Sequence, residues 1–249
     1  MIKIYTDGFN VYLKTLCKED TKSLAIIAND YEIAFNIANL GSFPYPYKIS
    51  SAKSFIDFAS KAFDKEAEFH FGIFLSNTNQ ILGVIGLKNL DQHISSAEIG
   101  YWIGRQFWNK GYASESIKLI LFLGFEYLAM NKLWGKTFYF NKASQRVMEN
   151  GGLRRDGILR EIAFITKFKA GYKEFIEYTS RGIDEGRLKT LSSRLNLESR
   201  IIESWNRRFV LKINPKVDID AGDVYVDEVL YSILKKEYQG PIKIDAVIA

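Results

Sequence analysis

Residues 97–116, with the sequence AEIGYWIGRQFWNKGYASES, constrain the fold of this chain more than any other segment. Alternation in the first half predicts a β-strand, and the apolar period of the residues that follow predicts a long helix beginning near Gly111. The start of a helix exposes unpaired N–H groups and the positive end of the dipole, which together attract anions. Gly111 lets a phosphate approach the backbone, and the small Ala113 and Ser114 leave the first turn open. The pattern predicts an α/β fold with a pyrophosphate site here, although ordinary turn chemistry explains the glycine as well.

The remaining patterns predict further strands and helices around this segment. Pro44 and Pro46 mark an aromatic turn, and Phe55, Phe58 and Phe63 are predicted core residues. The predicted order is a strand at 11–16, helices at 20–39 and from about 50, strands at 69–75, 80–89 and 96–104, a helix at 111–130, a strand at 132–140, a helix at 141–150, and strands at 157–168 and 173–180.

The pattern changes after Ser180, which predicts two units: a domain over 1–180 and a small α/β extension over 181–249. The extension is predicted as a helix at 185–206, the strand FVLKINP, an amphipathic helix over 223–238 and a closing strand, IKIDAVIA. The Asp218-x-Asp220-x-Gly222 spacing resembles part of a calcium loop. Val229 stands where a bidentate glutamate would be needed, so a turn and helix cap is the better interpretation.

Composition excludes several classes of protein. With 47% hydrophobic residues the chain can bury a core, while a single cysteine, Cys17, and two distant histidines, His70 and His93, argue against disulfide scaffolds and metal sites. We found no apolar run of membrane-spanning length and no signal peptide, so we expect a cytoplasmic protein without membrane contact. The net charge of +5 is diffuse, so direct nucleic-acid binding is not expected.

Two separated motifs resemble those of the GCN5-related N-acetyltransferase (GNAT) superfamily, in particular its ribosomal-protein N-terminal acetyltransferase branch. FWNKGYASES is similar to that branch's Trp-Gly-Lys-Gly-Tyr-Ala-Thr-Glu-Ala, and NKASQRVMENGGLRRDG matches its Asn-x-x-Ser and Glu-x-x-Gly-Phe pattern. The predicted order of elements is similar from the first strand to about Ser180. The resemblance implies the GNAT fold: a mixed, mostly antiparallel central sheet flanked by helices, here followed by a helix-strand-helix-strand extension.

The resemblance also implies a binding site for acetyl-coenzyme A, with no metal. Main-chain N–H groups of the loop would hold the pyrophosphate, the edge of strand 99–103 would pair with the pantetheine arm, and Asn141 would contact that arm from the next strand. The implied cofactor-binding residues are Trp102, Ile103, Trp108, Asn109, Lys110, Gly111, Tyr112, Ala113, Ser114, Asn141 and Ser144.

Acetyl transfer to an amine needs a base, because an amine is mostly protonated at neutral pH, and an acid for the departing thiolate. Glu98 on the cofactor strand matches a family glutamate and is the favoured base, and a solvated strand charge is the alternative. Glu161 is the second candidate, two residues before Ala163, which takes the aligned position. Ser144 matches a serine that the branch uses as acid, although capping or cofactor contact explains it too.

The resemblance implies an N-acetyltransferase that moves an acetyl group from acetyl-coenzyme A to a primary amine in a ternary complex. The acceptor would be a protein or peptide N-terminus or a small-molecule amine. Tyr45 and Tyr47 lie where the family forms its acceptor site, and packing around the prolines explains them equally well. A homodimer is possible. The alternative function is a catalytically silent acetyl-coenzyme A sensor or assembly module that acts through its extension.

Overall fold

The computed structural model describes residues 2–37, 43–139, 141–165, 224–240 and 245–248. In these ranges the chain forms one nine-stranded sheet in the order β7-β8-β6-β5-β4-β3-β2-β1-β9, in which only β5 and β6 run parallel. The strands are β1 (Ile2–Tyr5), β2 (Val11–Thr15), β3 (Phe69–Leu75), β4 (Ile81–Asp91), β5 (Ser96–Ile103), β6 (Lys132–Phe138), β7 (Arg154–Ile165), β8 (Val224–Leu234) and β9 (Asp245–Ile248). The predicted mixed, mostly antiparallel sheet is confirmed.

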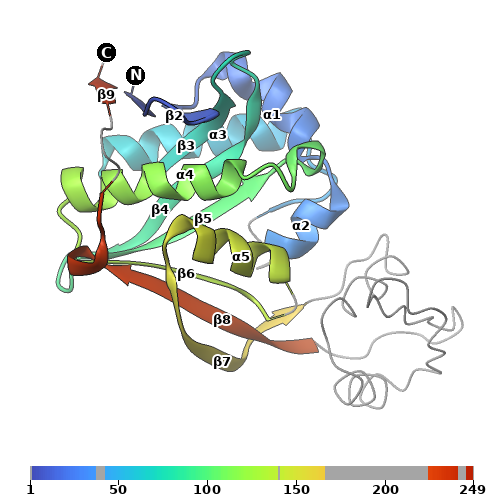
Figure 1. Cartoon of the computed structure of the whole chain (residues 1–249). Coiled ribbons are helices and arrows are strands. Elements are labelled where there is room, and N and C mark those ends of the chain that lie inside the picture. Colours follow the sequence, from blue (N-terminus) through green and yellow to red (C-terminus); the bar gives the residue numbers. More distant parts are fainter. Residues whose placement is uncertain (1, 38–42, 140, 166–223, 241–244, 249) are drawn as a thin grey trace, which may run out of the picture.

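Helices cover both faces of the sheet (Figure 1). Helices α4 and α5 lie in front of it in this view, and α1 and α3 lie behind. The helical elements are η1 (Lys18–Asp20), α1 (Thr21–Ala28), α2 (Tyr31–Ile37), α3 (Ile49–Asp64), η2 (Arg105–Phe107), α4 (Tyr112–Phe122), the π-helical turn η3 (Leu123–Tyr127), α5 (Lys142–Gly151) and η4 (Lys235–Glu237).

A glycine sets the distance between the two front helices. A Cβ placed on Gly151 of α5 would stand 2.5 Å from Cγ2 of Ile117 on α4, so only glycine allows this approach. Gly152 then ends α5 with a φ of 105°, as the Gly-Gly pair predicted. The close packing holds the beginnings of α4 and α5 near the same end of the sheet.

Two of the predicted helices form only in part. The helix expected over 20–39 is interrupted, because the Asp30 carboxylate accepts the N–H groups of Glu32 and Ile33 and starts a new helix, α2, after Asn29. The helix expected over 111–130 changes to a π-helical turn after Phe122. Of the predicted core phenylalanines, Phe58 is 49% exposed, whereas Phe55 and Phe63 pack against the core.

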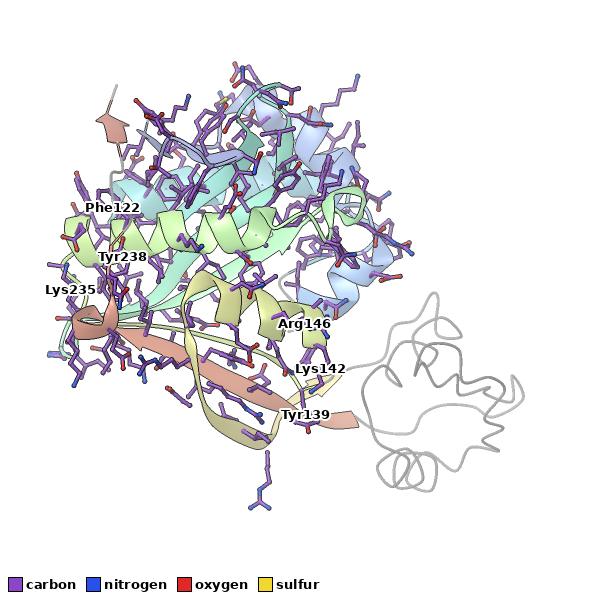
Figure 2. The ribbon with its side chains drawn as sticks, viewed as in Figure 1. Phe122, Tyr139, Lys142, Arg146, Lys235 and Tyr238 are labelled. Atoms are coloured by element: carbon purple, nitrogen blue, oxygen red, sulfur yellow. The ribbon has the colours of Figure 1, made fainter. Side chains whose placement is uncertain are left out.

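The helix predicted over 223–238 is wrong. Residues 224–234 form β8, an interior strand that pairs with β7 from Val224 to Ser232 and with β6 from Glu228 to Leu234. Val229, Tyr231 and Ile233 are buried toward the core in strand alternation, and burial between two partner strands overrides the helical period of the same apolar residues. Figure 2 shows Lys235 and Tyr238, just after β8, beside the end of α4 marked by Phe122. There Lys235 donates to the Phe125 carbonyl at 2.6 Å.

Both strands described after residue 223 belong to the central sheet. β8 lies between β6 and β7, and β9, where a closing strand was predicted, pairs with β1. Ile165 at the end of β7 pairs with Val224 at the beginning of β8, so the chain leaves and re-enters the sheet at neighbouring positions. The predicted boundary at 180, the strand at 173–180, the helix at 185–206, FVLKINP and the Asp218 turn lie outside the described residues.

Candidate functional site

The loop before α4 has the backbone expected of an anion cradle. Gly111 is the N-cap of α4 with a φ of 80°, a left-handed conformation that glycine adopts without strain, and Asn109 also has a positive φ of 61°. A Cβ on Gly111 would meet nothing within 4 Å, so the space in front of the helix is open. The first intrahelical bond runs from the Glu115 N–H to the Gly111 carbonyl, which leaves the preceding N–H groups for a ligand. This geometry fits a pyrophosphate.

Glu115 stands in the first turn of α4, where its negative charge would oppose an anionic ligand. Its two carboxylate oxygens instead accept the backbone N–H of Asn10 at 2.8 Å and the Asn10 side-chain amide at 2.9 Å. This pair of hydrogen bonds anchors the chain before β2 to the beginning of α4. The carboxylate is thereby held on the β2 side of the helix.

Strands β5 and β6 stop pairing where the cofactor arm was predicted to enter. Their parallel pairing runs from Ser96 and Lys132 to Glu98 and Trp134 and does not continue over the described residues 99–103 and 135–138. The edge of β5 is therefore open for an added strand. One of its acceptors is already used, because the Trp108 indole donates to the Ile103 carbonyl at 2.6 Å. This bond positions the loop against the end of β5.

Tyr101, Asn141 and Ser144 form a hydrogen-bonded cluster beside this opening. The Tyr101 hydroxyl lies 2.8 Å from Ser144 Oγ and donates to the Ser144 carbonyl at 3.1 Å, and the Asn141 side chain caps α5 by accepting the Ser144 N–H. Burial raises the pKa of Tyr101 well above its usual value, a rise that the hydrogen bond from Ser144 only partly offsets. The phenol therefore keeps its proton at physiological pH.

Glu98 lies on the opposite face of β5 from Tyr101, because side chains three residues apart on a strand point to opposite sides. It is 5% exposed and contacts two partners from β4: Lys88 Nζ at 3.3 Å and the Asn89 amide at 2.7 Å. Glu98 is also the last residue of β5 that pairs with β6. A buried carboxylate therefore stands where the two strands separate.

Aromatic side chains occupy the same face of β5 as Glu98. Trp102 packs edge-on against Phe43 at 5.7 Å, and Phe43 packs against Tyr47 at 4.8 Å. Tyr47 is buried, and burial raises its pKa to about 12, which favours the packing interpretation for this residue. Tyr45, which precedes the cis peptide bond to Pro46, is 39% exposed.

Arg105 connects helix α2 to the loop in front of α4. Its guanidinium lies 3.1 Å from the buried carboxylate of Glu32 on α2, and it comes three residues before Trp108. The structure therefore ties α2 to the loop in front of α4. Sequence reasoning missed Arg105, and a charge in an exposed loop carries no signal of a buried partner 73 positions away.

The structure divides the site residues between the two faces of the sheet. The structure brings Gly111 and its neighbours, the open edge of β5, and Tyr101, Asn141 and Ser144 to one side, and Glu98 and Tyr47 to the other. Tyr112 and Ala113 pack against the core, Ser114 contacts α5 through the Val147 carbonyl, and Lys110 is exposed. For Glu161 only the backbone is described, on β7. The sequence analysis missed Tyr101, although strand alternation over 96–103 places its side chain on the other face of the strand from Glu98.

Lys142, the first residue of α5, places its ammonium group against an aromatic ring. Figure 2 shows Lys142 and Tyr139 at the beginning of this helix, and Lys142 Nζ lies 4.1 Å from the centre of the Tyr139 ring. Burial and the neighbouring Arg155 lower the pKa of Lys142.

The described ranges contain no group of three or more His, Cys, Asp or Glu side chains that could bind a metal ion. No helix in these ranges is long and apolar enough to cross a membrane.

Comparison with known proteins decides the family. The model of the acetyltransferase (GNAT) domain matches residues 10–154, more than half of the chain. The chain belongs to the GNAT acetyltransferase family. A relative from Bacillus licheniformis, the uncharacterized N-acetyltransferase p20, is 27% identical over 161 residues, which cover 65% of this chain and 87% of the relative. This acetyltransferase therefore uses acetyl-coenzyme A as its acetyl donor.

Solved structures share the fold at lower identity. The microcin self-immunity acetyltransferase MccE, in complex with acetyl-CoA and AMP, superposes with a TM-score of 0.60 at 16% identity and covers 91% of this chain and 93% of its own. RimL, a ribosomal-protein alpha-N-acetyltransferase in complex with coenzyme A, gives a TM-score of 0.62 at 11% identity, with coverage of 93% and 97%. The GNAT fold predicted from the motifs is confirmed.

Proposed function

We propose that this enzyme acetylates a primary amine, either a protein or peptide N-terminus or a small-molecule amine, by direct transfer in a ternary complex. The observation that carries the proposal is the opening between β5 and β6, with Glu98 on one face of the sheet and the Tyr101–Ser144 pair on the other. A thioester at the opening would have a base toward its carbonyl side and a proton donor toward its sulfur.

The protein groups divide the proton transfers between the two faces. Glu98 takes a proton from the incoming ammonium group, because only the neutral amine has a lone pair for attack. As the C–N bond forms and the C–S bond breaks, Ser144 Oγ supplies a proton to the sulfur, and the second proton that the nitrogen loses as the amide forms restores the Ser144 hydroxyl. The Tyr101 phenol, which its raised pKa keeps protonated, stays hydrogen-bonded to Ser144 during this exchange. The bound acetyl-coenzyme A supplies the activated acyl group.

The main-chain N–H groups in front of α4 would hold the pyrophosphate of acetyl-coenzyme A, and Asn109 to Ala113 line that loop. The open edge of β5 near Trp102 and Ile103 would pair with the amides of the pantetheine arm, and Asn141 would face it from the beginning of α5. The acceptor would approach on the Glu98 face. A peptide acceptor is supported by RimL, a ribosomal-protein acetyltransferase.

Glu98→Gln tests the proposed base. The variant keeps an oxygen for Asn89 and removes the proton acceptor, so we expect turnover with an amine panel to fall on the order of 100-fold or more. The affinity for acetyl-coenzyme A, measured by calorimetry, should stay within about twofold, because no cofactor contact is removed.

Ser144→Ala gives the matched comparison on the other face. It should lower kcat most for reactions in which departure of the thiolate limits the rate, and leave the pH dependence on the base side unchanged. Wild-type protein that binds acetyl-coenzyme A but acetylates no amine would favour the silent sensor instead.

A further inference from the structure

Lys88 holds its own amine against the candidate base. It lies on β4 directly opposite Glu98 on β5, and its Nζ is 3.3 Å from Glu98 Oε1. The side chain is 40% exposed while that of Glu98 is 7% exposed, so the ammonium group lies between solvent and a buried carboxylate. An amine in this position has the same chemical relationship to Glu98 as the amine of an acceptor.

The lysine also follows β5 to the point where the strand opens. Gly100 lacks a side chain, and a Cβ there would stand 3.3 Å from Lys88 Cε and 3.9 Å from Lys88 Nζ. Gly100 belongs to the part of β5 that no longer pairs with β6. Lys88 Nζ therefore lies beside the candidate base and near Gly100, on the strand whose free edge the proposed function assigns to the acetyl donor.

We propose that Lys88 is a self-acetylation site of this enzyme, an inference that rests on the proposed function of Glu98. Glu98 removes one proton from the Lys88 ammonium, and the neutral Nζ attacks the thioester carbonyl carbon. A C–N bond forms and the C–S bond breaks. The second amine proton replaces the one that Ser144 Oγ supplies to the departing sulfur, so Nε-acetyl-lysine and the free thiol of coenzyme A result.

Acetylation would change the site that produces it. The acetyl group removes the positive charge that faces Glu98 and leaves the Asn89 amide as a hydrogen-bond donor to this buried carboxylate. An acceptor amine would then meet an occupied position above Gly100. We therefore expect the modified enzyme to turn over external amines more slowly than the unmodified enzyme.

Lys132 provides a matched internal control. It is 35% exposed, and its Nζ lies 3.3 Å from a carboxylate oxygen of Asp156, the same distance as in the Lys88–Glu98 pair. It begins β6 at a position that still pairs with β5 and therefore precedes the opening. The two lysines differ in burial of the partner carboxylate and in their distance from the opening.

The experiment incubates the full chain with isotope-labelled acetyl-coenzyme A and follows labelled acetyl groups on Lys88 and Lys132 by peptide mass spectrometry. We expect Lys88 to be labelled at least about tenfold faster than Lys132, at a rate independent of protein concentration, and to lose that advantage in Glu98→Gln. Lys88→Arg should remove the fast site and leave the labelling of Lys132 unchanged. Equal rates at the two lysines in wild-type protein, or an unchanged Lys88 rate in Glu98→Gln, would overturn the proposal.

A second arm uses p-nitrophenyl acetate, a small acetyl donor that needs no coenzyme site. If Glu98 activates Lys88, the ratio of Lys88 to Lys132 labelling should exceed one in wild-type protein and fall in Glu98→Gln, and an unchanged ratio contradicts it. The wild-type protein could instead turn over an external amine while Lys88 and Lys132 are labelled equally. That result would contradict self-acetylation but not the proposed function. Failure to bind acetyl-coenzyme A at millimolar concentration contradicts the proposed function itself.

Discussion

At the scale of single residues, Gly111 determines whether the loop can present its N–H groups. Its φ of 80° is costly for any residue with a Cβ, although the space around it is open. Gly111→Ala should therefore destabilise the fold by about 1 kcal/mol and weaken acetyl-coenzyme A binding, as measured by urea denaturation and calorimetry.

Gly157 on β7 is the matched control for this change. A Cβ there also meets nothing within 4 Å, and its φ lies outside the left-handed region. Gly157→Ala should leave both the unfolding free energy and the cofactor affinity nearly unchanged. If the two alanine variants behaved alike, backbone conformation would not be the basis of the effect at Gly111.

Buried tyrosines give the protein a pH dependence in alkaline solution. Burial raises the pKa of Tyr47 to about 12 and that of Tyr101 still further, whereas an unfolded tyrosine titrates near pH 10. The folded state therefore retains protons that the unfolded chain releases. This stabilisation is complete below about pH 10 and is lost as the pH rises toward the folded pKa values.

Urea denaturation between pH 8 and pH 11 checks this sign. The unfolding free energy should fall above about pH 10, and it should fall less steeply in Tyr101→Phe, which removes one of the titrating groups. Identical slopes for the variant and the wild type would count against a proton held at Tyr101 in the folded state.

At the scale of elements, the packing of α4 against α5 depends on Gly151. Alanine there would place its Cβ 2.5 Å from Ile117 Cγ2, and one of the two helices would have to move. Gly151→Ala should cost about 1–3 kcal/mol of unfolding free energy. Asn150→Ala, at an exposed position of the same helix, should change it by about 0.5 kcal/mol or less. A Gly151 variant as stable as the Asn150 variant would contradict this account of the interface.

Element predictions succeeded where one period dominates the segment. The strands around the turn at 76–79, the strand with Glu98 and the helix ended by Gly151-Gly152 all form close to their predicted positions. The prediction failed over 223–238. The apolar residues Val226, Val229, Leu230 and Ile233 recur with a helical period, but Val229, Tyr231 and Ile233 also lie two residues apart, as in a β-strand. Local spacing cannot distinguish the two when the deciding term is burial between partner strands.

At the scale of the whole molecule, β8 makes residues after 223 part of the sheet core. Residues 166–223 connect β7 to β8, whose ends are paired at Ile165 and Val224. Replacement of 166–223 by a two-residue Asn-Gly turn should leave a folded protein that binds acetyl-coenzyme A. Truncation after Ser180 should give insoluble protein, since it removes β8 and buried Tyr231. A soluble truncated chain that binds the cofactor would instead support a separate extension over 181–249.

The sequence alone determined the family and the cofactor, and it pointed to the loop before α4 as the pyrophosphate site, because glycine at a strand-to-helix turn and the two motifs are local signals. It also pointed to Glu98 and Ser144 as a base and an acid. Only the tertiary structure placed these two on opposite faces of the sheet, brought Lys88 and Tyr101 to them, and turned most of the predicted 223–238 helix into an interior strand. Those outcomes depend on which strands pair and on what each side chain meets when buried, and neither is encoded in the spacing of neighbouring residues.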